Sequence, residues 1–203
     1  HMVDALTTNK TDFFRENHHF EFLKDNVLPS LSTSHLKIWS AGCSSGEEPY
    51  SIAITLKEAQ QQTPFTFEIL GTDLSYKILQ VASKAVYPSD AVGLSLERKM
   101  SFFLKSKNSD TPTIRVNKYL RRTVKFQRLN LVTPPYSITN NKFDLIFFRN
   151  VMIYFDRITQ QKVLTALCNK LKTGGYLFIG HSESITSLDL PLKQVEPTVF
   201  IKL

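Results

Sequence analysis

The residues of this chain best suited to chemistry follow an apolar stretch, "IWSA", near residue 40. A loop of small residues comes next, with glycines at Gly42 and Gly46, and then Glu47 and Glu48 open a helical pattern. Such loops often hold phosphate at a helix N-terminus. A phosphate about 4 Å from one carboxylate, at an effective dielectric constant of about 20, would be destabilised by about 4 kcal/mol. Because the spacing is G-x-x-x-G and no G-K-[ST] is present, the loop argues against NAD and ATP.

A further acid indicates which ligand the loop serves. Asp73 lies 27 residues after Gly46, roughly where an acid binds the ribose hydroxyls in dinucleotide-binding folds. A nucleoside without phosphate and with positive charge fits these acids, which favours S-adenosylmethionine. Acids at a helix N-terminus also interact with the helix dipole, by about 0.3–1 kcal/mol. We assign that simpler role to Glu47 and a ligand role to Glu48.

Alternating strands and helices must position these residues. The patterns predict strands at 36–41, 65–75, 143–150 and 176–184, helices at 8–28, 46–60, 75–85 and 158–171, and a terminal hairpin at 192–203. We expect Gly174 and Gly175 to end the last helix. Repeated strand–helix units indicate an α/β fold, a doubly wound and mainly parallel sheet with helices on both faces. Ligands of such sheets lie at the carboxyl ends of the strands.

A basic segment interrupts this alternation. Residues 97–128 contain ten lysines and arginines against two acids, a net charge of +8 in a chain whose total is +7. A helix at 94–106 and two short strands within 113–127, joined by 117–122, predict a small antiparallel β insertion. Such a concentration of charge suits an acidic protein surface, nucleic acid or anionic lipid.

Composition bounds the class of protein. The 203 residues predict one domain, 3–203, after a tag remnant at 1–2. No run approaches ~18 apolar residues, so we expect a cytoplasmic protein without membrane insertion. Cys43 and Cys168 form neither a disulfide framework nor a metal pattern. The histidines lack zinc-like spacing, and we interpret His181 as a structural hydrogen-bonding residue at a strand end.

Four motifs resemble the CheR family of chemotaxis-receptor methyltransferases: "TDFFRENHHF", "WSAGCSSGEEPYSIAITL", "FDLIFFRNVMIYFD" and "GYLFIGHSES". The resemblance implies a seven-stranded, Rossmann-like methyltransferase sheet. It also implies methyl transfer from S-adenosylmethionine to glutamate side chains on the cytoplasmic helices of chemoreceptors, with S-adenosylhomocysteine as the other product and no metal.

The family's site residues carry over by motif. Arg15 and Tyr154 correspond to residues at the methyl-transfer centre, Asp73 to the ribose contact, and Asn130 and Leu131 to residues beside the adenine. The full set of expected cofactor contacts is Asn9, Thr11, Arg15, Gly42, Glu48, Asp73, Asn130, Leu131, Arg149 and Asn150.

This chain departs from the family pattern in two places. Typical members begin with a small helical domain that helps bind the receptor, and this sequence starts after it, through truncation or as a naturally short relative. The loop "KSKNSDTPT" has no glycine, so we do not expect it to tether a receptor pentapeptide as some members do. We expect a monomer whose partner is the acidic surface of a chemoreceptor.

Two alternatives remain open from the residues. A non-catalytic module that binds S-adenosylmethionine would keep Glu48 and Asp73 but lose Arg15 or Tyr154, and all four are present. A nucleic-acid methyltransferase would use the same sheet and basic segment. The motif "TPPY" precedes the strand that it should follow in an amino-methylating enzyme, so we interpret Pro134 and Pro135 as a turn and expect no nucleic-acid partner.

Overall fold

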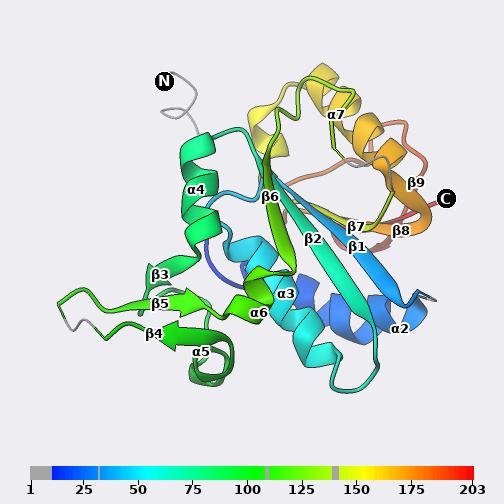
Figure 1. The fold of residues 1–203 in the computed structure, drawn as a ribbon. Coiled ribbons are helices and arrows are strands. Elements are labelled where there is room, and N and C mark those ends of the chain that lie inside the picture. Colours follow the sequence, from blue (N-terminus) through cyan, green and yellow to red (C-terminus); the bar gives the residue numbers. More distant parts are fainter. Residues whose placement is uncertain (1–10, 32, 108–109, 139–141) are drawn as a thin grey trace.

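The computed structural model describes residues 11–31, 33–107, 110–138 and 142–203, and it confirms the predicted α/β fold (Figure 1). The strands of the main sheet lie in the order β6 (Val124–Arg128), β2 (Thr66–Asp73), β1 (His35–Ala41), β7 (Phe143–Phe148), β8 (Leu171–Ile179), β10 (Val199–Lys202) and β9 (Leu192–Glu196). Neighbouring strands from β6 to β8 pair in parallel, and the hairpin of β9 and β10 adds antiparallel strands at the other edge.

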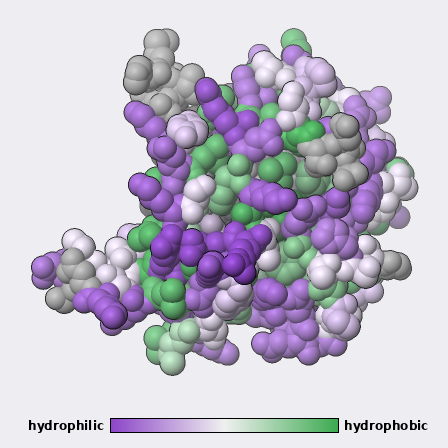
Figure 2. Space-filling model, viewed as in Figure 1, coloured by the Kyte–Doolittle hydropathy of each residue, from purple (hydrophilic) through white to green (hydrophobic). Residues whose placement is uncertain are grey.

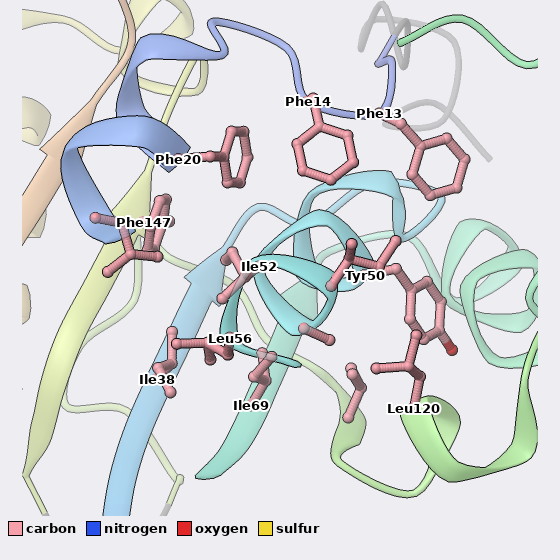
Figure 3. Packing of buried hydrophobic residues seen from close by; sticks show 14 of the residues in the cluster. Phe13, Phe14, Phe20, Ile38, Tyr50, Ile52, Leu56, Ile69, Leu120 and Phe147 are labelled. Carbon is pink, nitrogen blue, oxygen red and sulfur yellow. The ribbon is translucent and has the colours of Figure 1, made fainter. Parts of the chain in front are cut away.

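Helices cover both faces of this sheet because side chains alternate along each strand. One face carries α1 (His18–Phe22), the π-helical turn η2 (Leu23–Val27) and α3 (Glu47–Ala59), and the other carries α7 (Arg157–Lys170). In β1, Ile38 packs with Ile52 and Leu56 of α3 (Figure 3). The next residue, Trp39, packs on the opposite face in the same cluster as Leu164 of α7. Helix α4 (Tyr76–Lys84) contacts β6 and β2 near the first edge.

The N-terminal segment differs from the predicted helix at 8–28. Helix α1 begins only at His18, and residues 11–17 form turns in which Phe14 and Glu16 adopt left-handed backbone conformations. Consecutive Phe13 and Phe14 are both buried, and the Phe14 amide donates to Ser51 Oγ of α3 at 2.9 Å. A helix would turn these neighbours in different directions, so burial of both rings overrides helix propensity here. The helical segment also continues past the predicted end at residue 28, because Pro29 lies within a last turn, α2 (Leu28–Ser30).

The basic insertion is built differently from the prediction. Its three-stranded sheet has the order β3 (Val86–Pro88), β5 (Thr113–Val116) and β4 (Phe103–Lys105), with α5 (Leu96–Phe102) and α6 (Lys118–Arg121) beside it. The prediction that 124–128 pairs with 113–116 was therefore wrong. That segment is β6, which lies parallel to β2 and aligns Val124 with Ile69. This pairing buries Val124 on the α3 face and brings the end of β6 beside Asp73.

Two helices also end at residues other than those predicted. Helix α5 stops at Phe102, where Phe103 enters β4 and is buried. Helix α7 ends at Lys170, and Gly174 and Gly175 lie within β8. A Cβ atom on Gly175 would lie 2.7 Å from the carbonyl oxygen of Asp144 in β7. This glycine therefore permits close strand contact and does not end the helix.

Candidate active site

A cavity of about 780 Å³ opens at the carboxyl ends of β1, β2, β6 and β7. It lies where a parallel sheet of this type places its ligand. Ten residues that the sequence singled out line it together: Thr11, Arg15, Gly42, Glu48, Asp73, Asn130, Leu131, Arg149, Asn150 and Tyr154. Asn9, the remaining predicted contact, lies outside the described residues. Thr11 and Arg15 lie in the turns before α1 and line the cavity. They reach the site although this segment is not the helix that the sequence predicted.

Asp73 is fixed at the end of β2 by backbone donors. Its Oδ2 accepts from the Ser44 amide and its Oδ1 from the Ser75 amide, each at 3.0 Å. Gly42 has a φ of 87°, and a Cβ atom there would lie 2.4 Å from Cγ2 of Val151. The glycine therefore permits both the left-handed backbone and the close approach of the loop after β7. The loop and the acid form one rigid wall of the cavity.

The Glu48 carboxylate at the cavity is held by two side chains. Its Oε1 accepts from Ser40 Oγ at 2.7 Å, and its Oε2 accepts from Nε of Arg149 at 2.8 Å. Glu47, one position earlier, accepts from Ser45 Oγ at 2.6 Å. Burial raises the pKa of the Glu47 carboxyl. Glu48 is among the lining residues and Glu47 is not, and the ligand role of Glu48 stays a prediction.

The Arg149 side chain is buried and connects several segments. Its Nη1 donates to the backbone oxygen of Arg15 and to Nδ1 of His19, both at 2.8 Å, and lies 3.4 Å from Oε2 of Glu16. Burial, and then the Arg149 charge, lower the pKa of His19 to about 2. The neutral ring accepts at Nδ1, so its Nε2 donates to Oγ1 of Thr198 at 2.7 Å. Arg149 thus ties the N-terminal turn to the sheet.

The sequence reasoning missed two acids that hold the loop after β7. Glu183 accepts the backbone amides of Asn150 at 3.0 Å, Met152 at 2.8 Å and Gly180 at 2.6 Å. Burial raises the pKa of its carboxyl. Glu16 Oε1 accepts from Asn150 Nδ2 at 3.2 Å and from the His181 amide at 3.1 Å. These contacts support the left-handed backbone of Asn150, which has a φ of 59°.

The lining also bears on the choice of ligand. Its charged residues are Asp12, Arg15, Glu48, Asp73 and Arg149, and neither lysine nor histidine is among the described residues that line it. Asp73 and the ion pair of Glu48 and Arg149 suit a ligand that carries hydroxyls, an ammonium and a carboxylate better than one that carries a pyrophosphate. Cys43 also lines the cavity, but burial raises the pKa of its thiol well above its ordinary value, so it is no nucleophile at neutral pH.

The described part of the chain also bears on metal binding and membrane insertion. Within it, no three or more His, Cys, Asp or Glu side chains are placed to hold a metal ion. No helix among the same residues is long and apolar enough to cross a membrane.

A doubly wound sheet with a glycine loop, an acid that ends its second strand and a cavity over its carboxyl edge is typical of nucleoside-binding folds, and the acids at the loop favour the class of S-adenosylmethionine-dependent methyltransferases. Within that class, the chain belongs to the CheR methyltransferase family, because the family model described as "CheR methyltransferase, SAM binding domain" matches residues 9–201. The resemblance stated from the motifs is thereby confirmed.

Curated relatives agree with this assignment. The chain is 39% identical to the chemotaxis protein methyltransferase of Borreliella burgdorferi, over 99% of this chain and 73% of that protein. It is 40% identical to chemotaxis protein methyltransferase 2 of Pseudomonas aeruginosa, over 98% of this chain and 71% of that protein. It is 38% identical to the chemotaxis protein methyltransferase of Salmonella typhimurium, over 92% of this chain and 64% of that protein. The match thus spans most of this chain and about two thirds to three quarters of each relative.

Proposed function

We propose that this protein transfers the methyl group of S-adenosylmethionine to side-chain carboxylates of glutamates in the cytoplasmic helices of chemoreceptors. The observation that carries the proposal is that Arg15 and Tyr154, the two residues expected at the methyl-transfer centre, line the same cavity as Asp73 and the ion pair of Glu48 and Arg149. The names of the relatives, which are chemotaxis methyltransferases, support the choice of a receptor as substrate.

The residues of the cavity suit this cofactor. Asp73, held by two amides, would accept from ribose hydroxyls, and Asn130 and Leu131 would flank the adenine. Asn130 Oδ1 accepts from the Val132 amide at 3.2 Å, and the Leu131 carbonyl accepts from the Tyr136 hydroxyl at 2.8 Å, so this wall is already ordered. Glu48 and Arg149 would face the ammonium and carboxylate of the methionine part, since each can pair with one of them.

The reaction requires the protein mainly to position the acceptor carboxylate against the methyl group. Bound S-adenosylmethionine supplies a methyl group on a sulfonium, which a carboxylate oxygen accepts to give a neutral ester and a neutral thioether. A glutamate has an ordinary pKa of about 4.3, so it is anionic at neutral pH and needs no general base. The described lining accordingly offers neither a histidine nor an ionised thiol to act as one.

Arg15 and Tyr154 are suited to hold the acceptor. The Arg15 guanidinium would dock the incoming carboxylate, and the Tyr154 hydroxyl, on a side chain that is 50% exposed at the cavity mouth, would orient it. Too tight a grip on the ground state would slow the reaction, so Arg15 must stabilise the transition state at least as well. Val151, an apolar lining residue between Asn150 and Tyr154, would help to keep water from the reacting atoms.

A methyl-transfer assay tests the proposal. The protein is incubated with S-adenosylmethionine labelled in the methyl group and with a purified chemoreceptor cytoplasmic fragment from the same organism. The expected product is label on glutamates that mild base releases as methanol. Tight cofactor binding without transfer would instead indicate a binding module, and label that is transferred to added RNA or DNA would indicate a nucleic-acid enzyme.

A further inference from the structure

A second, smaller cavity of about 330 Å³ lies beside α6, outside the site described above. Three cationic side chains, Lys118, Arg121 and Arg122, form its rim, while Tyr50 of α3 and Val124 and Phe126 of β6 contribute apolar surface. We call it the basic groove. It lies in the segment that holds the positive charge of the chain, and Figure 2 shows strongly hydrophilic side chains gathered over α6, with apolar surface next to them.

The basic groove differs in charge pairing from the rest of its segment. No described carboxylate forms an ion pair with Lys118, Arg121 or Arg122, whereas two other cations of the same segment are paired. Arg121 Nε donates to the Val116 carbonyl at 3.1 Å, which fixes this side chain against the small sheet. Three like charges around one hollow produce a positive potential that attracts an anionic group.

The basic groove and the methyl-transfer cavity share two elements. In the first turns of α3, Glu48 lines the cavity and Tyr50 lines the groove. Strand β6 runs from α6 toward the edge of the sheet where the cavity lies (Figure 1), and Phe126 lies three residues before Leu129 of the cavity. A strand rises about 3.3 Å per residue, so these positions are about 10 Å apart along the chain direction. A ligand that occupies both sites must therefore span at least about 10 Å, as a helical segment of a protein can.

We infer that the basic groove docks acidic side chains of the protein substrate, carried on the same helix as the glutamate that is methylated. This inference rests on the proposed function. An α-helix spans about 10 Å in about seven residues, so a substrate helix of a few turns is long enough to reach from the groove to the neighbouring cavity. Glutamate side chains present a carboxylate to the rim and methylene groups to Val124 and Phe126. Nucleic acid fits less well, since its affinity grows with the number of neutralised phosphates and the groove gathers only three cations.

Neutralising the rim tests the inference. The triple variant Lys118→Gln, Arg121→Gln, Arg122→Gln removes three charges from the groove. A matched control, Lys24→Gln, Lys162→Gln, Lys193→Gln, removes three exposed charges elsewhere. The groove variant should raise KM for the receptor fragment about tenfold or more, because several modest ion pairs are lost together. Its kcat and its affinity for S-adenosylhomocysteine should match the control. Added salt should raise KM of the wild type more steeply than that of the groove variant.

Equal KM values for the groove and control variants would overturn the inference. If the triple variant unfolds, the double variant Lys118→Gln, Arg122→Gln keeps the Arg121 contact with Val116 and is used in its place.

Direct binding separates this inference from the proposed function. The receptor fragment is titrated into each protein in the presence of S-adenosylhomocysteine. Binding that the groove variant loses, without any methyl transfer by the wild type, would support the groove and reject the function. Methyl transfer by the wild type, together with equal binding of the fragment by the groove variant and the control variant, would support the function and reject the groove. Failure of the wild type to bind the fragment, or tighter groove-dependent binding of a short DNA duplex, would overturn the docking inference.

Discussion

Arg149 Nε donates to Oε2 of Glu48 at 2.8 Å, across the 101 positions that separate the end of β7 from the start of α3. Both side chains are nearly inaccessible to solvent, at 2% and 12% exposed. Loss of one member of a buried pair leaves the other charge uncompensated, which typically costs about 3–5 kcal/mol. The pair therefore supports the fold as well as the cavity that it lines.

Glu48→Gln should accordingly lower both stability and cofactor affinity. We expect the free energy of unfolding to fall by about 2–4 kcal/mol, somewhat less than for full truncation because the amide oxygen still accepts from Ser40. Affinity for S-adenosylhomocysteine should fall at least about tenfold. Denaturant unfolding and calorimetric titration measure the two effects. Glu47→Gln is the control, because its partner Ser45 is local and it does not line the cavity; equal losses in the two variants would contradict the assignment.

Asp73→Asn should weaken both the fold and cofactor binding. The amide oxygen can keep one of the two backbone donors, Ser44 or Ser75, and the lost hydrogen bond to a charged group is worth about 1.5–3 kcal/mol. If the carboxylate also binds the ribose hydroxyls, the Kd for S-adenosylhomocysteine should rise about 10- to 100-fold. The Kd for adenosine alone should rise by the same factor in Asp73→Asn. If the variant and the wild type bound adenosine with equal Kd, Asp73 would not contact the ribose.

His19 predicts an acid sensitivity with a defined sign. Its pKa is about 2 in the folded protein and about 6.5 when unfolded. Between these values the unfolded chain binds a proton that the folded chain does not, so stability falls as pH drops below about 6.5, by up to about 1.4 kcal/mol per pH unit. His19→Asn should be less stable at pH 7 but should show a shallower fall between pH 6.5 and 5. Unfolding curves at several pH values would contradict the assignment if the two slopes were equal.

Glu183→Gln should loosen the loop that carries Asn150. The carboxylate accepts three amides on its two oxygens, and an amide side chain would turn a donor toward at least one of them. We expect a loss of about 1–3 kcal/mol in stability. Hydrogen exchange at Asn150 and Met152 should become faster, and kcat should fall. Ser184→Ala, next to it on an exposed side chain, should change none of these quantities.

The fold and much of the site were predictable because both leave local signals. Short apolar runs mark the central strands, the glycine loop precedes a helix, and Asp73 ends its strand, so the carboxyl edge could be found from the sequence. Contacts across the chain left no such signal. Glu16 bonds to His181, 165 positions away, and Glu183 reaches back to Asn150. The predicted helix at 8–28 was wrong from 11 to 17 for the same reason, since burial of Phe13 and Phe14 depends on tertiary packing.

Arg15 and Tyr154 allow the proposed chemistry to be separated from cofactor binding. The Arg15 contact with Arg149 is made by its backbone oxygen and its side chain is exposed, so Arg15→Ala should keep that contact and change the unfolding free energy by no more than about 1 kcal/mol. Tyr154→Phe removes one hydroxyl from a side chain that is half exposed, with the same expectation for stability. Loss of the docking charge should lower kcat for the receptor fragment about 100-fold, and loss of the hydroxyl about tenfold.

The comparison that decides these roles is between turnover and binding. Arg15 is also expected to contact the cofactor, so the Kd for S-adenosylhomocysteine should rise in Arg15→Ala and stay constant in Tyr154→Phe. Single-turnover methylation at saturating cofactor isolates the transfer step from that binding effect. Because a carboxylate acceptor needs no base, the single-turnover rate should stay flat with pH above about 6 in the wild type and in both variants. A rate that kept its wild-type value in Arg15→Ala would remove Arg15 from the transfer step, and a rate that rose with pH would point to a base that the proposal does not contain.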